Sequence, residues 1–358
     1  MRIVSSLLKR IVYPSLASAG VFHRTNAQGL AIITYHGVLP PGYAHIDAVL
    51  DGNLIRADDL RRQLRLLKTR YNVISPEEFF DWREERRALP PKSVLLTCDD
   101  GLLNCLTDML PVLQDESVKC LFFVTGASAT DVRSMLWYEE LFLLFLKGPA
   151  GGFAVSSEGI VIQGALDSRN QRRTVWWDSV KRLSQVNATQ RACFIHSLRE
   201  RFGANADRIF GDASSPSCRR YGLLTASEVR QLISAGMSIG AHTLSHPMLS
   251  QLPPAIAYEE IVESRKRLES ALKRRVWAFA YPFGDPQSVT PQVLAMPHEA
   301  GYQVALLNFG GGLGSALSPY SLPRIHVTAA MRLSELEAHV SGFYTRLQLH
   351  ARRGSSLE

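Results

Sequence analysis

Two short polar motifs, far apart in the chain, carry residue types that can bind a metal and move a proton. The first is Cys98-Asp99-Asp100-Gly101, and the second is His242-Thr243-Leu244-Ser245-His246-Pro247. A borderline divalent ion such as zinc accepts both imidazole nitrogen and carboxylate oxygen, and a catalytic site needs only three protein ligands because water takes the open position. Two aspartates and two histidines therefore predict a metal site with one carboxylate left over for proton transfer.

Each motif also has an ordinary structural interpretation. Adjacent aspartates before a glycine commonly form a solvated turn at a strand end. Histidines four residues apart point the same way if a helical turn joins them, and Pro247 would end such a turn, yet pairs at this spacing also occur without a metal. We expect a shared catalytic metal, which the histidine spacing suits if the intervening residues form such a turn. A purely structural metal site is the alternative.

The composition is that of an ordinary globular protein and argues against several classes. The chain has 358 residues, of which 46% are hydrophobic and 20% charged, with a formal net charge of +7. Its 5 cysteines are odd in number and form no CxxC pair, which argues against a disulfide framework and against a cysteine zinc cluster. The basic excess lies largely in the first 28 residues, and no nucleic-acid-binding module is recognisable, so we expect no nucleic-acid partner.

Residues 1–28 form a basic segment of their own. Lys9 and Arg10 interrupt the apolar stretch 3–16, which is therefore too short and too charged to cross a bilayer. The same pair lies inside the stretch that a cleaved secretory signal would keep apolar. We expect an uncleaved amphipathic helix that packs on the domain or touches a membrane surface. The corresponding location is cytoplasmic or peripheral to a membrane, with a periplasmic location left open.

Short apolar, β-rich runs recur along the chain and predict seven buried parallel strands. Continuous rather than alternating apolar character is expected where both faces of a strand are covered. Helical patterns lie between most of these runs, and this alternation predicts an α/β barrel with its chemistry on the loops at the carboxyl ends of the strands. The runs lie at 30–35, 94–98, 120–125, 238–241, 276–281, 302–307 and 322–327, and the helical patterns at 57–69, 102–114, 225–235 and 254–273.

The polar groups fall at those strand ends. His36 follows the first run, Asp99 and Asp100 follow the second, and His242 follows the run that begins at residue 238. Pro282-Phe283-Gly284-Asp285 follows the run at 276–281, and His326 lies within the last run. Because the carboxyl ends of barrel strands meet at one rim, we expect these side chains to gather there.

The stretch 130–224 interrupts this rhythm. It holds an amphipathic helical pattern at 137–145, a polar patch rich in Ser, Gly and Asn, and a second helical pattern at 189–202. We expect an inserted subdomain or lid that shapes the cleft, because long insertions in barrels commonly arise from rim loops. The predicted organisation is thus a segment 1–28, a domain 29–345 with an insert at 130–224, and a tail 346–358.

On these motifs the sequence resembles the polysaccharide deacetylase family, the NodB-homology esterases of carbohydrate esterase family 4. Thr97-Cys98-Asp99-Asp100-Gly101 is similar to the family's Thr-Phe-Asp-Asp-Gly motif, with Cys98 in place of phenylalanine. The histidine motif resembles His-Ser/Thr-x-x-His-Pro without departure. Tyr281-Pro282-Phe283-Gly284 is similar to the third motif, and Thr34-Tyr35-His36-Gly37 to an opening Tyr-His segment. The resemblance covers residues 29–330, outside the insert.

The resemblance implies a distorted (β/α)7 barrel and the metal-dependent removal of acetyl from an N-acetylated amino sugar in a glycan or glycolipid. Asp99 would be the general base. Asp100, His242 and His246 would hold a divalent metal, with zinc expected and cobalt or nickel able to replace it. A backbone N–H near Phe283 would stabilise the oxyanion.

Further candidate residues would surround the substrate. Tyr281, Pro282 and Phe283 would contact the substrate or the oxyanion, and His36 would line the pocket, a hydrogen bond to the Asp99 loop being an equal alternative for His36. His326 would be the general acid, because an imidazole can deliver a proton to a leaving amine near neutral pH. A core histidine bonded to backbone is the alternative for His326.

Departures from the family pattern define the alternative functions. The third motif normally carries an arginine that pairs with the base, but residues 279–281 contain none, and Arg324 is predicted from its position to replace it. The family's Leu-x-His motif reads Arg324-Ile325-His326, and its remaining Asp-containing motif is not recognisable in 300–317. The alternatives are an O-acetyl carbohydrate esterase and a catalytically silent member that binds a glycan.

Overall fold

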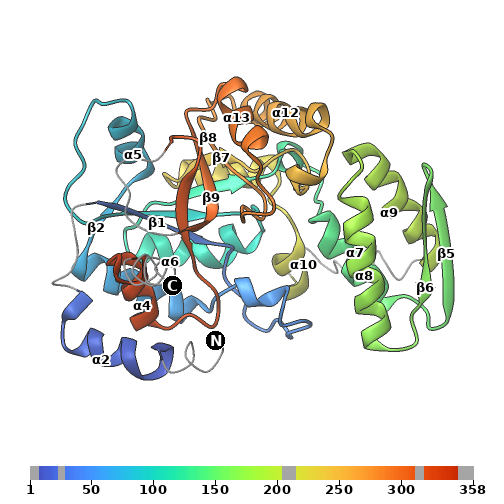
Figure 1. Cartoon of the computed structure of the whole chain (residues 1–358), viewed down its shortest axis with the longest axis horizontal. Coiled ribbons are helices and arrows are strands. Elements are labelled where there is room, and N and C mark those ends of the chain that lie inside the picture. The colour runs from blue at the N-terminus through green and yellow to red at the C-terminus, as the bar shows by residue number, and fades with distance from the viewer. Residues whose placement is uncertain (1–7, 23–28, 204–214, 311–317, 346–358) are drawn as a thin grey trace, which may run out of the picture.

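The computed structural model describes residues 8–22, 29–203, 215–310 and 318–345, and a closed barrel of parallel strands lies at its centre (Figure 1). The ring runs in the order β1-β10-β9-β8-β7-β4-β3, and β1 closes it by pairing with β3 from Leu30↔Ser93 to Tyr35↔Cys98. The predicted (β/α)7 barrel is confirmed. Its strands are β1 (Leu30–Tyr35), β3 (Ser93–Cys98), β4 (Leu121–Val124), β7 (Ser238–Ala241), β8 (Ala278–Ala280), β9 (Val304–Gly310) and β10 (Leu322–His326).

Both faces of the barrel strands are buried, as the continuous apolar runs predict. Alternate residues of one strand enter two different clusters: Ile33 packs with the outer helices, whereas Ile32 packs with residues of the opposite face. One strand beside the barrel was not predicted. β2 (Asn72–Ile74) pairs with the first residues of β3 outside the ring, and its three residues are too few to form a recognisable pattern.

Helices cover the outside of the barrel close to the predicted positions. The pattern at 102–114 is the exception, because a π-helical turn η3 (Cys105–Met109) precedes α6 (Leu110–Asp115), in which Pro111 lacks the N–H that a continuous helix needs. Three further helices lie at predicted positions: α4 (Ala57–Arg70), α11 (Ala226–Ser234) and α12 (Pro254–Leu272). Three more covering helices were not predicted: α5 (Pro76–Arg83), α13 (Pro291–Glu299) and α14 (Leu333–Val340).

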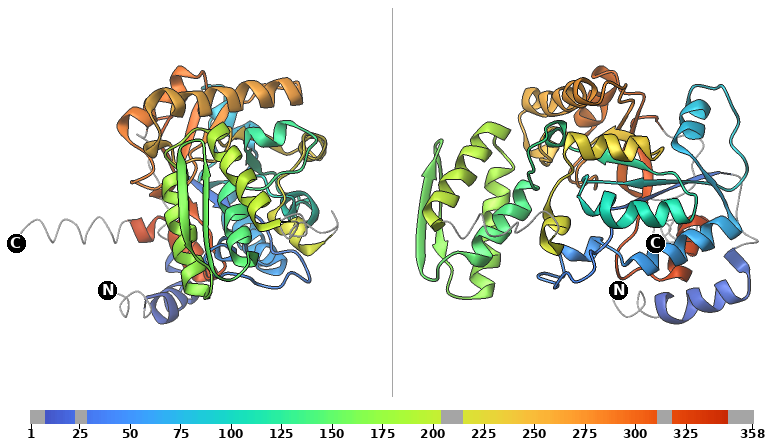
Figure 2. Two further views of the ribbon diagram at one scale, coloured as in Figure 1. Left: turned by 90° about the vertical axis from the view of Figure 1, so that its right-hand side faces the viewer. Right: turned by 180° about the vertical axis from the view of Figure 1, so that it is seen from behind.

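The insert folds beside the barrel as a compact unit with its own apolar core (Figures 1 and 2). The core includes Leu141, Phe145, Trp176 and Phe194. The polar patch expected between the two helical patterns is in fact an antiparallel hairpin followed by a further helix. The first strand of the hairpin looks polar in the sequence because only alternate residues of it are buried. The elements are α7 (Trp137–Lys147), β5 (Gly152–Ser157), β6 (Ile160–Ala165), α8 (Arg169–Leu183), α9 (Ala188–Phe202) and α10 (Pro216–Tyr221).

The described part of the basic N-terminal segment packs on the barrel domain. It forms η1 (Leu8–Val12) and α2 (Tyr13–Ser18), and Tyr13 and Phe22 pack with residues of the C-terminal region. Lys9 forms an ion pair of 2.7 Å with Glu335 of α14. Among the described helices, none is long and apolar enough to cross a membrane. The predicted tail 346–358 lies outside the described residues.

Candidate metal centre and active site

A tight turn after β3 presents the two aspartates. Asp100 and Gly101 both have a left-handed backbone, with φ of 74° and 71°. A side chain at position 101 would place its Cβ 2.9 Å from a methyl carbon of Val124, so glycine is needed there for space as well as for conformation. The turn therefore leaves Asp99 at the end of the strand and directs Asp100 toward the histidine loop.

The two histidines meet through an irregular loop and not through the helical turn that would also suit their spacing. Thr243 and His246 have φ of 60° and 61°, which a right-handed turn does not contain. The Thr243 hydroxyl accepts the His246 N–H at 2.9 Å, which closes the loop. His242 Nδ1 lies 2.7 Å from the Ala280 carbonyl, an arrangement that leaves its Nε2 free to face Asp100.

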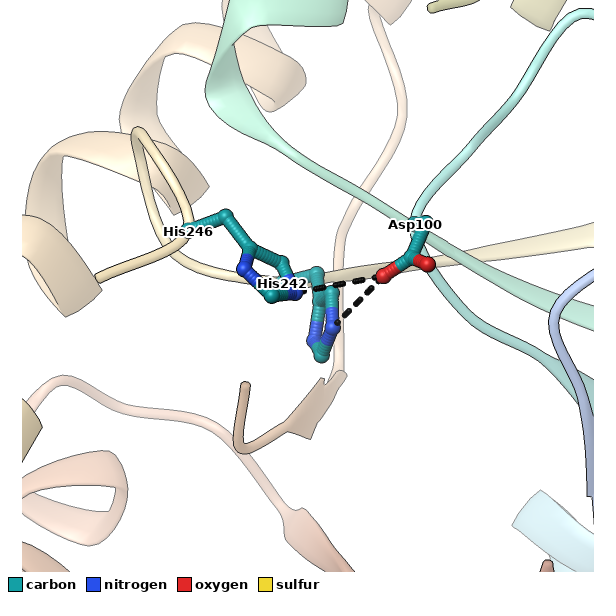
Figure 3. Close-up of side chains that lie close together, drawn as sticks. All are labelled: Asp100, His242 and His246. Carbon is teal, nitrogen blue, oxygen red and sulfur yellow. Dashed lines mark ion pairs between the residues drawn. The ribbon is translucent and has the colours of Figure 1, made fainter. Parts of the chain in front are cut away.

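Asp100, His242 and His246 form the predicted triad (Figure 3). Asp100 Oδ1 lies 3.5 Å from His242 Nε2 and 3.2 Å from His246 Nε2, and the ligand atoms all lie within 4.8 Å of one another. In a tetrahedral zinc site with bonds of about 2.0–2.2 Å, neighbouring ligand atoms are about 3.4 Å apart. The three side chains therefore fit a divalent metal.

The charges of the triad also suit a metal. Burial raises the pKa of Asp100, but hydrogen bonds from His242 and His246 more than offset it and hold that pKa well below its ordinary value. Burial lowers the pKa of His246, with partial compensation by Asp100. An ionised carboxylate and a neutral imidazole are the protonation states that bind metals.

Asp99 is paired with Arg324, as its position in the sequence predicted. Arg324 Nη1 and Nη2 donate to the two Asp99 oxygens at 2.7 and 2.6 Å, and both side chains are fully buried. Burial raises the pKa of Asp99, but the Arg324 charge leads the opposing effects and the net pKa is lowered. Asp99 is therefore ionised at neutral pH and lies beside the triad without belonging to it.

The triad and Asp99 open onto one cavity of about 360 Å³. His36, Phe283 and His326, all predicted from the sequence, also line it. Phe283 has a φ of 61°, and among the described residues no backbone oxygen accepts its N–H. The rings of Tyr138, His246 and Phe283 contact one another, with the His246 centroid 5.4 Å from that of Tyr138 and 5.1 Å from that of Phe283.

Tyr281 and Pro282 do not line the cavity, so their predicted contact with substrate is wrong. Phe279 and Tyr281 pack with the outer helices, since alternate residues of the β8 segment share a face. The Tyr281 hydroxyl donates to the Tyr320 carbonyl at 2.9 Å. Pro282 is buried, and its carbonyl accepts the Gly284 N–H.

His326 lines the cavity beside His36, with ring centroids 4.7 Å apart. Burial is the main cause that lowers the pKa of His326 to about 3, and the neighbouring His36 adds to the effect. The imidazole is therefore neutral at rest near pH 7. It can donate a proton only after it takes one up during the reaction.

The insert contributes a wall of the cavity that the motifs do not reveal. Tyr138 and Glu139 of α7 and Trp176 and Trp177 of α8 line it. Trp177 is 43% exposed and packs against Trp176, with centroids 4.5 Å apart and the ring planes tilted by 36°. The tandem tryptophans in an otherwise polar helix are the one sequence signal that could have indicated this wall.

Comparisons with known proteins agree with the motifs. The family model described as Polysaccharide deacetylase matches residues 169–305, which contain the histidine loop but not Asp99 or Asp100. YxkH of Bacillus subtilis (strain 168), which is named as a polysaccharide deacetylase, is 25% identical over 117 residues, or 33% of this chain and 41% of that protein. The chain thus matches less than half the length of this relative.

Two solved structures share the fold across most of the chain. The Streptococcus pyogenes deacetylase PplD in complex with acetate has 18% identity and a TM-score of 0.53, with 88% of this chain and 99% of that chain covered. IcaB from Ammonifex degensii has 17% identity and a TM-score of 0.53, with 88% and 98% covered. With the sequence matches and the motifs, these structures bear out the resemblance of the chain to the polysaccharide deacetylase family.

Proposed function

We propose that the protein is a metal-dependent deacetylase that hydrolyses the acetamide of an N-acetylated amino sugar in a glycan or glycolipid. The observation that carries the proposal is the ionised Asp99 beside the Asp100, His242 and His246 triad, on one cavity. A metal triad with an ionised carboxylate beside it, outside the set of metal ligands, suits metal-assisted hydrolysis, because the carboxylate can accept the proton of a water that the metal activates. The resemblance to the polysaccharide deacetylase family and the cavity support a carbohydrate substrate.

The three triad residues would hold the metal, with zinc expected and cobalt or nickel as replacements. When bound, such an ion polarises the acetyl carbonyl and lowers the pKa of a water molecule. The three side chains are buried, which strengthens the charge interactions among them.

Asp99 would accept the proton of the attacking water. Arg324 holds it ionised and in a fixed orientation through two hydrogen bonds. As the carbonyl oxygen gains negative charge, the Phe283 N–H would donate to it, which is the usual role of a free backbone N–H at an oxyanion site. The chain thus offers one group for the proton and one for the charge.

His326 would return the proton to the leaving nitrogen. It is neutral at rest, and the negative charge that develops beside it in the reaction would raise its pKa and let it take up the proton. Its position on the cavity wall with His36 suits that transfer. His326 would therefore act as the acid only during turnover.

The test is an assay on a matched pair of sugars that differ only in an N-acetyl or an O-acetyl group. Metal-free protein is reloaded with zinc, and acetate release and free amine are measured separately. Acetate with an equal amount of amine supports the proposal. Acetate from the ester alone would make the protein an esterase, and no acetate from either, with metal bound, would make it a silent glycan-binding member.

A further inference from the structure

The insert holds the loop that carries the two metal-binding histidines. Trp137, the first residue of α7, donates its indole N–H to the His246 carbonyl at 3.1 Å. Trp137 is 7% exposed, so this hydrogen bond is shielded from water. A residue of the insert thus contacts the backbone of a metal ligand directly.

A second contact comes from Arg191 of α9. Its Nη2 donates to the Ser245 hydroxyl at 2.7 Å, one residue before His246. Its Nη1 donates to the carbonyls of Leu183 and Val186 at 3.0 and 3.2 Å, which ties the guanidinium to the insert's own backbone. The guanidinium also lies over the Trp137 ring, 4.9 Å from its centroid. Arg191 and Trp137 therefore pack on each other and contact the same histidine loop.

The barrel holds the same loop from the other side through Glu260 of α12. Glu260 accepts the Ser245 hydroxyl at 2.5 Å and the Ser245 N–H at 2.9 Å. Its carboxylate lies 3.7 Å from Arg191, and both side chains are almost fully buried. Ser245 is consequently fixed between the insert and the barrel.

The loop needs such fixation because its backbone is strained. Thr243 and His246 are non-glycine residues with left-handed φ values, and such a backbone persists only where its surroundings determine it. His246 must also keep its ring at a fixed angle for its Nε2 to face Asp100, 3.2 Å away. Partners that orient a metal ligand set the affinity of the site for its metal.

We propose that Trp137 and Arg191 are positioning residues of the metal centre, through which the insert sets the metal affinity of the barrel. The inference rests on the proposed metal site, but it concerns two residues that touch neither metal nor substrate. The insert is then part of the metal centre as well as a wall of the cavity.

The first test compares two indole deletions. Trp137→Phe removes the N–H that reaches His246, and Trp176→Phe removes a similar N–H that donates to the Tyr138 carbonyl at 2.8 Å inside the insert. Zinc affinity is measured by competition with a chromophoric chelator, and cobalt spectra report the ligand geometry. We expect about 10–100-fold weaker binding for Trp137→Phe and an unchanged affinity for Trp176→Phe.

The second test keeps the charge and removes the fork of the guanidinium. Arg191→Lys can still pair with Glu260, but it cannot bond Ser245 and the carbonyls of Leu183 and Val186 together. Arg172→Lys is the matched control, because Arg172 donates to three carbonyls of the insert and to no residue of the metal loop. We expect weaker zinc binding for Arg191→Lys alone.

The outcomes separate this inference from the proposed function. Wild-type protein that binds neither zinc nor cobalt would reject the metal site itself. Wild-type binding with equal affinity in folded Trp137→Phe and Arg191→Lys, as judged by circular dichroism, would reject only the positioning role. Equal losses in the test variants and their controls would also reject it, because they would reflect general loosening of the insert.

Discussion

Arg324 and Asp99 form a fully buried, two-pronged ion pair across 225 positions of sequence. Arg324 comes from β10 and also donates to the Thr34 and Thr97 hydroxyls at 3.1 Å, and to the Leu307 carbonyl at 2.7 Å. Strands from several parts of the barrel thus fix the guanidinium. The arginine that the third motif lacks after β8 is supplied by β10, which β9 separates from β8 in the ring.

This pair predicts the acid limb of the pH–rate profile. With Arg324 present the pKa of Asp99 lies below its ordinary value, so the base stays ionised as the pH falls to that range. In Arg324→Lys the fork is lost while burial persists, so the pKa of Asp99 should rise and the acid limb should move to higher pH. The profile of kcat/KM against pH measures the shift.

Arg133→Lys is the matched control for that shift. Arg133 forms a similar two-pronged pair with Glu228, at 2.9 and 2.7 Å, away from the cavity. The control should leave the acid limb in place. An unmoved limb in folded Arg324→Lys would contradict the assignment of Arg324 as the partner of the base.

The sequence was sufficient for the barrel and the metal ligands because both depend on local patterns. A short apolar run predicts a buried strand, and a motif such as Asp99-Asp100-Gly101 keeps its chemistry within a few residues. The side-chain direction of Tyr281 could not be predicted, because it depends on which alternate residues of the segment that begins with β8 face the outer helices. The contribution of the insert to the cavity wall could not be predicted either, because Trp177 reaches the cavity only through tertiary packing.

Asp99→Asn and His246→Ala should separate proton transfer from metal binding. Asp99→Asn keeps all three metal ligands and should bind zinc while acetate release falls by about 10²–10⁴-fold, the usual contribution of a general base. His246→Ala removes a ligand and should lose both zinc and activity. Metal content by elemental analysis and acetate release are measured on the same samples. Full activity in Asp99→Asn would exclude it as the base.

Metal removal should silence the enzyme without unfolding it. The barrel closes through backbone pairing of β1 with β3, and His242 is held by the Ala280 carbonyl, neither of which needs the ion. Chelation should therefore abolish acetate release while the far-ultraviolet circular dichroism stays unchanged. The melting temperature should fall modestly, because a ligand at 100 times its Kd stabilises the fold by about 2.7 kcal/mol. Unfolding on chelation would indicate a structural metal site instead.

His326→Gln tests the proposed acid. If His326 returns the proton to the leaving nitrogen, kcat should fall by about 10²–10⁴-fold with little change in zinc content. A substrate with a better leaving group, such as an activated acetanilide, should lose much less, because it needs no proton on departure. A loss under about tenfold with the natural acetamide would point to Asp99 as the group that both takes and returns the proton.

Trp177→Ala should weaken substrate binding without changing the metal centre. The indole is 43% exposed on the cavity wall and packs against Trp176, which gives an apolar face suited to the C–H face of a sugar ring. We expect KM for an N-acetylated oligosaccharide to rise several-fold, with kcat and zinc affinity near wild type. Val161→Ala is the control, because Val161 is 49% exposed on β6 and lines no described part of this cavity. An unchanged KM in Trp177→Ala would mean that the sugar does not contact the insert wall, and substrate selection would then lie with the barrel loops alone.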